Sequence, residues 1–266
     1  MNRIDTRFAE LRTRHRKALI PFFTAGDPML ESTVPVMHAL VAAGADVIEL
    51  GVPFSDPMAD GPTIQRSSER AIGRGAGLRY VLDTVREFRV GDAETPVVLM
   101  GYLNPIEIRG VETFAREAVD AGIDGVLLVD LPPEESGELR AAFDARGLVL
   151  VQLASPTTTD ARLAHLCANS QGYLYYVSFA GVTGAGGLDT RAALDRLHTI
   201  REQTDMPVVA GFGIRDAATA KAMAAESDGV VVGSALVDAI ATATDAAGAA
   251  RMAAEFLKPL RDALDA

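Results

Sequence analysis

Short apolar runs alternate with longer amphipathic stretches along the whole chain. Eight of these runs are rich in β-branched and aromatic residues and are bounded by Gly or Pro, which is typical of buried strands. They begin at residues 18, 46, 96, 125, 148, 173, 206 and 229. The stretches between them carry apolar residues at helical spacing, and several end at Gly, as helices commonly do. The pattern therefore predicts eight strand–helix units.

The pattern also predicts helices beyond one per strand. Residues 3–15 form a charged amphipathic segment before the first strand, residues 62–95 carry two helical patterns, and a short helix begins after the eighth strand. No linker-like or low-complexity segment divides the 266 residues. We therefore expect one α/β domain spanning residues 1–266, a closed (β/α)8 barrel (TIM barrel) rather than a doubly wound sheet with an appendage. The N-terminal helix is expected to close the bottom of the barrel.

Composition narrows the range of partners. The chain is 48% hydrophobic, enough for a large core, and its formal net charge is -11. Because nucleic acids and anionic membranes favour basic surfaces, neither is an expected partner. The one basic run, at residues 14–17, looks more like a solvated helix end than a binding patch. No apolar stretch reaches the length of a membrane span and the N-terminus is charged, so we expect a soluble, cytoplasmic protein.

The number and spacing of the cysteine and histidine residues argue against a disulfide and a metal site. Cys167 is the only cysteine, so no intrachain disulfide can form, and its helix-like setting suggests a small buried side chain. The four histidines, at residues 15, 38, 165 and 198, form no cluster with ligand spacing, so no metal site is expected.

Glu49 is unusual because it interrupts an apolar strand. The segment IELGVPFSDPMADGP begins at residue 48 as a buried strand and continues into a loop with two further carboxylates, Asp56 and Asp60. Strand alternation directs Glu49 into the barrel, toward its mouth, and Ile48 and Leu50 toward the helices. Burial raises the pKa of a carboxyl group, which allows it to give and take a proton near neutral pH. The alternative is a structural ion pair or a buried hydrogen bond.

The two loop aspartates could be ordinary turn residues, since Asp56 precedes Pro57 and Asp60 precedes Gly61. Their grouping directly after Glu49 favours a functional role, because loops after barrel strands carry function.

Gly-rich stretches follow the last three strands. Glycines let backbone N–H groups approach a ligand closely, and the start of a helix favours an anion. Because barrels often bind phosphate after strands 7 and 8, we predict a phosphate site that needs no basic residue. Its expected members are Gly184, Gly213, Gly233 and Ser234.

Apolar and aromatic side chains end several other strands. Each could belong to the core, but together at one end they would line a flat hydrophobic pocket beside the phosphate. They are Phe22, Met100, Tyr102, Tyr175 and Phe212.

These segments together resemble the tryptophan synthase alpha subunit family. The resemblance runs from about residue 18 to the C-terminus, and its most specific segment is IELGVPFSDPMADGP. The other matching segments are PFFTAGDP, MGYLNPI, VDLPPEE, YVSFAGVTGAGG, GFGI and VVVGSALV.

The resemblance implies a lyase that splits indole-3-glycerol phosphate into indole and glyceraldehyde 3-phosphate in tryptophan biosynthesis. Glu49 would be the main acid/base, and Asp60 would hold the indole N–H. Tyr175 and Phe22 would neighbour the substrate, Thr183 would pair with Asp60, and the four residues of the glycine-rich site would bind its phosphate.

The resemblance also implies an αββα complex with a beta subunit that carries pyridoxal phosphate and receives the indole. No cofactor is then expected in this chain. Two alternatives stay open: a stand-alone indole-releasing lyase, and a catalytically silent barrel that only binds a phosphorylated ligand. The presence of both Glu49 and Asp60 argues against the silent barrel.

Overall fold

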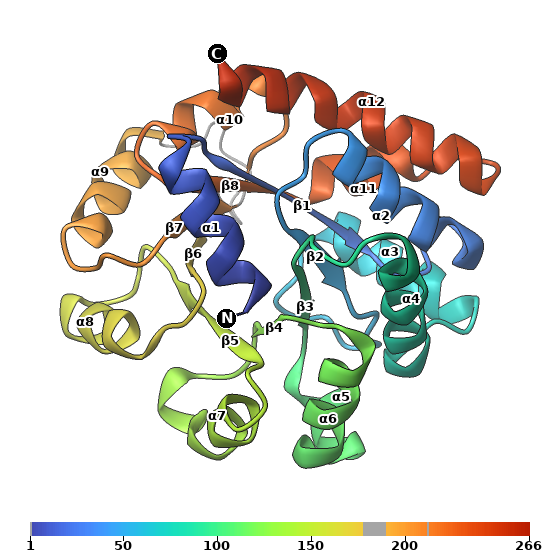
Figure 1. Cartoon of the computed structure of the whole chain (residues 1–266), viewed down its shortest axis with the longest axis horizontal. Coiled ribbons are helices and arrows are strands. Elements are labelled where there is room, and N and C mark those ends of the chain that lie inside the picture. The colour runs from blue at the N-terminus through green and yellow to red at the C-terminus, as the bar shows by residue number, and fades with distance from the viewer. Residues whose placement is uncertain (1, 178–189, 212) are drawn as a thin grey trace.

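Eight parallel strands form a closed barrel in the computed structural model, which describes residues 2–177, 190–211 and 213–266 (Figure 1). The strands pair in chain order and β8 pairs back with β1, so the sheet has no edge. They are β1 (Ala18–Thr24), β2 (Ile48–Gly51), β3 (Val97–Gly101), β4 (Gly125–Leu128), β5 (Val149–Ala154), β6 (Leu174–Val177), β7 (Val208–Gly211) and β8 (Gly229–Val232).

Helices surround the strands and cover their outer faces (Figure 1). They are α1 (Arg3–Thr13), α2 (Thr33–Ala42), α3 (Pro62–Gly73), α4 (Leu78–Gly91), α5 (Leu103–Arg109), α6 (Val111–Ala121), α7 (Gly137–Asp144), α8 (Asp160–Asn169), α9 (Thr190–Arg201), α10 (Ala217–Ala224), α11 (Ser234–Ile240) and α12 (Ala246–Asp265). Short 3-10 turns lie at Leu30–Ser32 and Pro133–Glu135.

The predicted barrel and its extra helices are confirmed. All eight predicted runs contain a strand, α1 precedes the first strand, α3 and α4 follow β2, and α11 and α12 follow β8. One feature differs, because β3 is also followed by two helices, α5 and α6. The apolar run of strand 3 continues into Leu103 and Pro105, which begin α5, so the pattern did not separate the strand from the helix.

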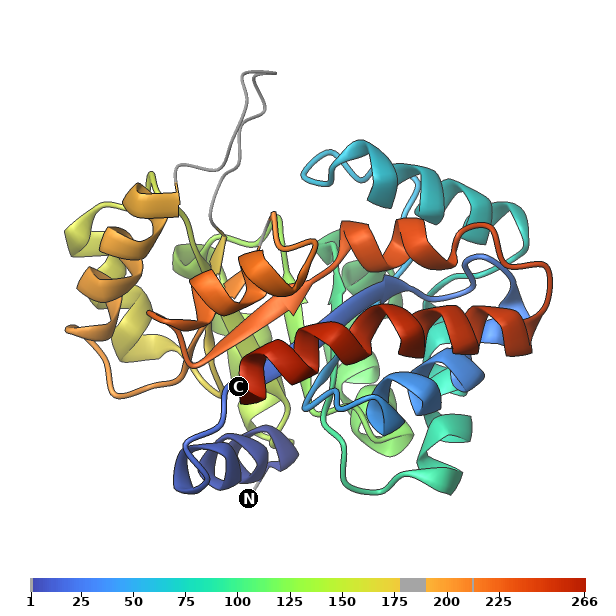
Figure 2. The same cartoon turned by 90° about the horizontal axis from the view of Figure 1, so that it is seen from above.

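Helix α1 closes one end of the barrel. Its buried residues Ile4, Phe8 and Leu11 lie on one face, and the ring of Phe8 lies 5.6 Å from that of Tyr173, just before β6. Figure 2 shows α1 at one end of the barrel and α3 at the other. The end covered by α1 is called the bottom below, and the carboxyl ends of the strands form the top.

Three aspartates hold neighbouring strands together at the bottom. Asp46, Asp124 and Asp228 precede β2, β4 and β8, and each accepts a hydrogen bond of 2.9 Å from an N–H group of the neighbouring strand. Each is also paired with an arginine: Asp46 with Arg261, Asp124 with Arg89, and Asp228 with Arg201. Because the N–H groups and the cations satisfy these carboxylates, the bottom rim is well suited to stability rather than chemistry.

Candidate active site

Glu49 lies inside the barrel and is completely buried. Its Oε1 accepts a hydrogen bond of 2.7 Å from the hydroxyl of Tyr173. Glu49 belongs to β2 and Tyr173 immediately precedes β6, on the opposite side of the closed sheet, so this bond crosses the barrel interior. The predicted inward orientation follows from the strand geometry.

The environment of Glu49 favours its neutral form. Burial raises the pKa of Glu49 from its usual 4.5 to about 7, and the hydrogen bond from Tyr173 opposes part of that rise. Its Oε2 is buried and has no hydrogen-bond partner among the described residues. An ionised carboxylate with one oxygen unsatisfied is costly in such a place, so the group is suited to proton transfer near neutral pH.

The direction of the Glu49 side chain differs in one respect from the sequence-based expectation. Tyr173 lies two residues before Tyr175 and packs against Phe8 of the bottom helix, so Glu49 bonds to a layer below the mouth. Glu49 does not line either of the two cavities at the top. Alternation along a strand fixes which face a side chain occupies, but its torsions decide whether the carboxylate turns up or down.

The raised pKa of Glu49 has a consequence for stability. The folded state binds the proton more tightly than the unfolded chain, so this stabilisation is fully present below about pH 4.5 and is lost as the pH rises through about 7. Glu49→Gln removes the titration. At about pH 8.5 the variant should be more stable than the wild type by about 3 kcal/mol, and near pH 4 the two should be similar. Urea unfolding at both pH values measures this difference, and an equal difference at both would contradict it.

Asp60 lies on the loop after β2 and is held by Tyr102. The hydroxyl of Tyr102 donates to Oδ2 of Asp60 at 3.0 Å and accepts from the backbone N–H of Ala59, also at 3.0 Å. Burial raises the pKa of Asp60, and the bond from Tyr102 opposes it. Burial, and then the charge of Asp60, raise the pKa of Tyr102. Tyr102 therefore fixes the end of this loop and lines neither top cavity, although the sequence suggested that it would.

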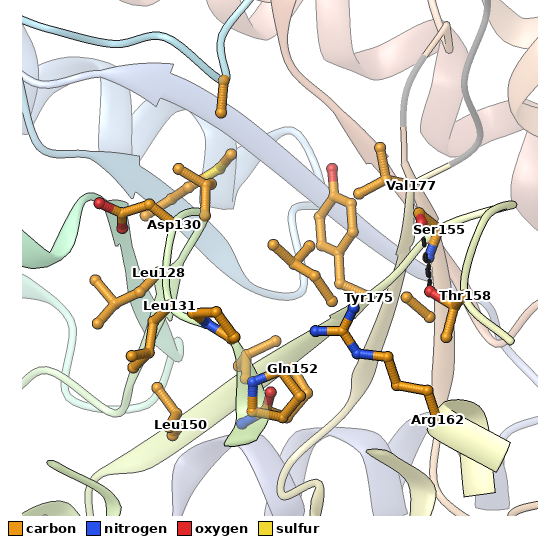
Figure 3. Close-up of a pocket in the computed structure, with 18 of the residues that line it drawn as sticks. Leu128, Asp130, Leu131, Leu150, Gln152, Ser155, Thr158, Arg162, Tyr175 and Val177 are labelled. Atoms are coloured by element: carbon orange, nitrogen blue, oxygen red, sulfur yellow. Dashed lines mark hydrogen bonds between the residues drawn. The ribbon is translucent and has the colours of Figure 1, made fainter. Parts of the chain in front are cut away.

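Two cavities open at the top of the barrel and share the walls formed by Asp60, Met100 and Tyr175. The larger has a volume of about 450 Å³ and extends over the ends of β4 and β5. Figure 3 shows Tyr175 among its lining residues and the Arg162 guanidinium extending toward its middle. The smaller, of about 210 Å³, lies over β1, β7 and β8.

The smaller cavity contains the predicted anion-binding residues that the structure describes. Gly213, with φ +80°, lines it together with Gly233 and Ser234 at the start of α11. Phe22 lines the same cavity, and a Cβ at Gly233 would lie 3.3 Å from its ring. Arg215, which the sequence-based prediction of a site that needs no basic residue did not include, also lines this cavity.

Tyr175 lies within the electrostatic influence of both carboxyl groups, Glu49 and Asp60. Burial raises its pKa well above the usual value, and the charges of Glu49 and Asp60 raise it further. Its hydroxyl lies so close to Gly211 that a Cβ there would fall 2.0 Å from the oxygen. Any side chain at Gly211 would therefore displace the ring that both cavities share.

Three predicted site residues, Thr183, Gly184 and Phe212, lie outside the described residues. Among the described residues, the sequence did not point to Tyr173, which bonds to Glu49, or to Ile64 and Arg215, which line the smaller cavity. The sequence gives only a weak indication of a role for Tyr173, which is that its polar hydroxyl stands at the start of a largely apolar strand. Arg215 directly follows the GFGI segment, and this position next to a predicted phosphate-binding glycine is its only signal in the sequence.

Neither a metal-binding cluster nor a membrane-spanning helix is found among the residues that the structure describes. Residues 2–177, 190–211 and 213–266 contain no group of three or more His, Cys, Asp or Glu side chains that could hold a metal ion. No described helix combines the length and the apolar character needed to cross a membrane.

Comparison with known proteins gives one consistent family. The family model described as tryptophan synthase alpha chain matches residues 8–264. The tryptophan synthase alpha chains of Xanthomonas oryzae pv. oryzae (strain MAFF 311018) and Xanthomonas campestris pv. campestris (strain 8004) are 71% and 69% identical over 266 residues, which is 100% of this chain and 99% and 98% of theirs.

Solved structures agree with this relationship. The tryptophan synthase subunit alpha of Legionella pneumophila str. Paris has a TM-score of 0.93 and 44% identity, covering 100% of this chain and 99% of that one. A chain of tryptophan synthase from M. tuberculosis in an aminoacrylate-bound form has a TM-score of 0.88 and 33% identity, covering 99% of this chain and 100% of that one. The chain belongs to the tryptophan synthase alpha chain family.

Proposed function

We propose that this chain is a carbon–carbon lyase that cleaves indole-3-glycerol phosphate into indole and glyceraldehyde 3-phosphate, the alpha reaction of tryptophan synthase. The observation that carries the proposal is a pair of carboxyl groups whose pKa is raised by burial, Glu49 to about 7 and Asp60 on the cavity wall. Acid/base cleavage of an indole–carbon bond needs one group that donates and accepts a proton, and one that stabilises positive charge on the ring.

The two top cavities suit the two parts of this substrate. The phosphate would lie in the smaller cavity, where Gly213 and Gly233 allow close approach to the backbone, and Ser234 and Arg215 offer donors. Gly184 would complete this site. The indole would lie against Met100 and Tyr175, with Phe22, Phe212 and Thr183 around it, and its N–H would donate to Asp60.

The reaction would begin with proton transfer from neutral Glu49 to the ring carbon that bears the glycerol chain. The ring then carries a positive charge, which the Asp60 carboxylate at the indole nitrogen stabilises. The bond to the glycerol carbon breaks, its electron pair returns to the ring, and the hydroxyl on that carbon becomes the aldehyde. The hydroxyl proton passes to Glu49, which regains its initial state.

Proton donation requires the Glu49 carboxyl to leave Tyr173 and turn up toward Tyr175, because the hydrogen bond to Tyr173 holds it below the cavity. With Glu49 as donor, kcat/KM should fall as the pH rises through about 7. Tyr173→Phe removes a hydrogen bond that favours the ionised form of Glu49. The fall of kcat/KM should therefore occur about one pH unit higher in this variant. The measurement is the pH profile of indole release.

Tyr176→Phe is the matched control for this prediction, because Tyr176 is also buried, lies on β6, and has a pKa that the charge of Glu49 does not shift. A profile that Tyr173→Phe leaves unchanged, or that Tyr176→Phe moves equally, would contradict the assigned role of Tyr173.

The family relationship also supports a beta-subunit partner, and we propose an α2β2 tetramer in which the pyridoxal phosphate belongs to the beta subunit. Large apolar side chains stand exposed at the top: Met58 on the loop after β2 is 79% exposed and Ile108 on α5 is 80% exposed. A partner seated there would cover them and hold the loop from Pro53 to Pro62.

The purified chain should release indole from indole-3-glycerol phosphate, and a beta subunit from the same source should raise the steady-state rate at least tenfold, about 1.4 kcal/mol of barrier. The reason is that, without the beta subunit, only a fraction of the molecules would have the loop from Pro53 to Pro62 in its catalytically competent arrangement. Asp56→Ala or Pro57→Ala should reduce that rise. Equal rates with and without the partner would favour the stand-alone lyase, and no indole in either case would favour the silent barrel.

A further inference from the structure

A third cavity, of about 290 Å³, lies at the bottom of the barrel, at the end opposite the candidate active site. Its floor comes from residues just before three strands: Lys17 before β1, Pro207 before β7 and Asp228 before β8. We call it the basic cavity, and its lining is completed by Phe8, Leu11, Arg12, His15 and Arg16.

One stripe of the N-terminal helix faces this floor. Phe8, Leu11 and Arg12 have the spacing of one helical face, His15 follows just beyond the end of α1, and all four line the basic cavity. This part of the lining is apolar at Phe8 and Leu11 and basic at Arg12 and His15. The cavity therefore offers an apolar wall next to cationic groups.

Two of the cations in the wall form no ion pair within the part of the chain that the structure describes. Arg16 pairs with Asp265 at 2.9 Å, and Asp228 with Arg201 at 3.6 Å. Lys17 and Arg12, by contrast, form no ion pair with any described residue and donate only to backbone carbonyl oxygens, those of Ser227 at 2.7 Å and Asp205 at 2.9 Å. On a protein of net charge -11, this local excess of positive charge needs an explanation.

Lys17 is partly withdrawn from water. Burial lowers the pKa of its ammonium group, and the carboxylate of Asp228 only partly opposes that effect. A cation that has lost hydration is stabilised by an anion placed beside it.

His15 adds an independent observation. Its φ of +52° is left-handed, and it follows the end of α1 in a position that glycine usually occupies. The N–H of His15 donates to the carbonyl of Arg12 at 3.1 Å and that of Arg16 to Leu11 at 2.9 Å, the bonds of a Schellman cap. A side chain in this conformation costs about 1 kcal/mol relative to glycine, so an imidazole here calls for a role.

We propose that the basic cavity binds a small organic anion, with its carboxylate or phosphate group on Lys17, Arg12 and His15 and its apolar part against Phe8 and Leu11. The volume suits a single-ring ligand. Of the basic run at residues 14–17, the last three residues then line the cavity. Arg14 alone remains a solvated helix end, since it is exposed and lines no part of the cavity.

Benzoate and phenyl phosphate serve as probes, because they share an aromatic body and differ in the anionic group. Glycerol 3-phosphate is added with phenyl phosphate to occupy the candidate active site. Titration of the full-length protein is followed by NMR at the amides of residues 12–17 and at the His15 ring. We expect saturable shifts confined to the bottom of the barrel with at least one probe, and benzamide, which has no charge, should produce none.

Arg12→Met and Lys17→Met should each weaken the Kd about tenfold, because each removes a charge-assisted hydrogen bond. His15→Gly should also weaken binding without lowering the Tm. Arg14→Met is the matched control and should bind as the wild type does. Arg12→Met keeps the test decisive if Lys17→Met fails to fold, since Arg12 is exposed.

The proposal fails if neither probe produces saturable shifts at residues 12–17. It also fails if Arg14→Met weakens binding as much as Arg12→Met, since that would indicate unspecific attraction to the basic run.

Discussion

Glu49→Gln should abolish most of the lyase turnover while leaving the barrel folded. The substitution keeps the shape of the side chain and removes its proton chemistry, so kcat should fall about 10²- to 10⁴-fold, roughly 3 to 5 kcal/mol of barrier. Because burial disfavours the ionised carboxylate, the variant should also resist urea better than the wild type above pH 7. Misfolding would lower both the activity and the stability, so a loss of activity together with a gain in stability points to the chemistry of Glu49.

The measurement is single-turnover indole release at saturating indole-3-glycerol phosphate, with and without the beta subunit. Gln152→Glu is a useful companion, since Gln152 is a buried residue of β5 that lines the larger top cavity, so its substitution adds a carboxyl group at a different position of the same site. It should not restore turnover to Glu49→Gln. Turnover near the wild-type rate in Glu49→Gln would exclude Glu49 as the acid/base.

Asp124→Ala should cause the largest loss of stability at the bottom of the barrel, about 3 to 5 kcal/mol, because it removes the nearest acidic partner of Arg89, a mostly buried arginine whose other acid, Asp92, lies 4.0 Å away. Asp124 is 3% exposed and accepts from Arg89 at 2.8 Å, from Arg3 at 2.9 Å and from the N–H of Val97 at 2.9 Å. Asp124→Asn keeps an acceptor for Val97 and should lose less. Urea unfolding near pH 7 measures both.

Asp120→Ala is the matched control for this network. Asp120 lies four residues earlier, is exposed and makes no ion pair with the described residues, so its removal should change the free energy of unfolding by less than about 0.5 kcal/mol. Similar losses for Asp120→Ala and Asp124→Ala would show that the buried network does not carry the stability assigned to it.

The strand order and the inward face of β2 were predictable because both depend on short-range periodicity. A buried parallel strand reads as a short apolar run, and eight such runs separated by helical patterns leave few ways to close a sheet. Alternation put Glu49 on the inner face. Helix α5 was missed, because the apolar run of strand 3 passes into it without a polar break.

Other features depend on contacts between segments far apart in the chain. Tyr173 and Glu49 are separated by 124 positions, and the bond between them exists only because barrel closure puts β2 opposite β6. Tyr102 looked like a pocket residue, but α5 begins directly after it and its hydroxyl reaches the loop after β2.

The sequence by itself determined the (β/α)8 architecture, the buried carboxyl on β2 and the family, since local periodicity and specific motifs carry that information. Only the tertiary structure decided that Glu49 bonds downward to Tyr173 and that Lys17, Arg12 and Asp228 meet in one cavity. The physical reason is that side-chain torsions and the register of strands distant in sequence are set by close packing in three dimensions, which no local pattern encodes.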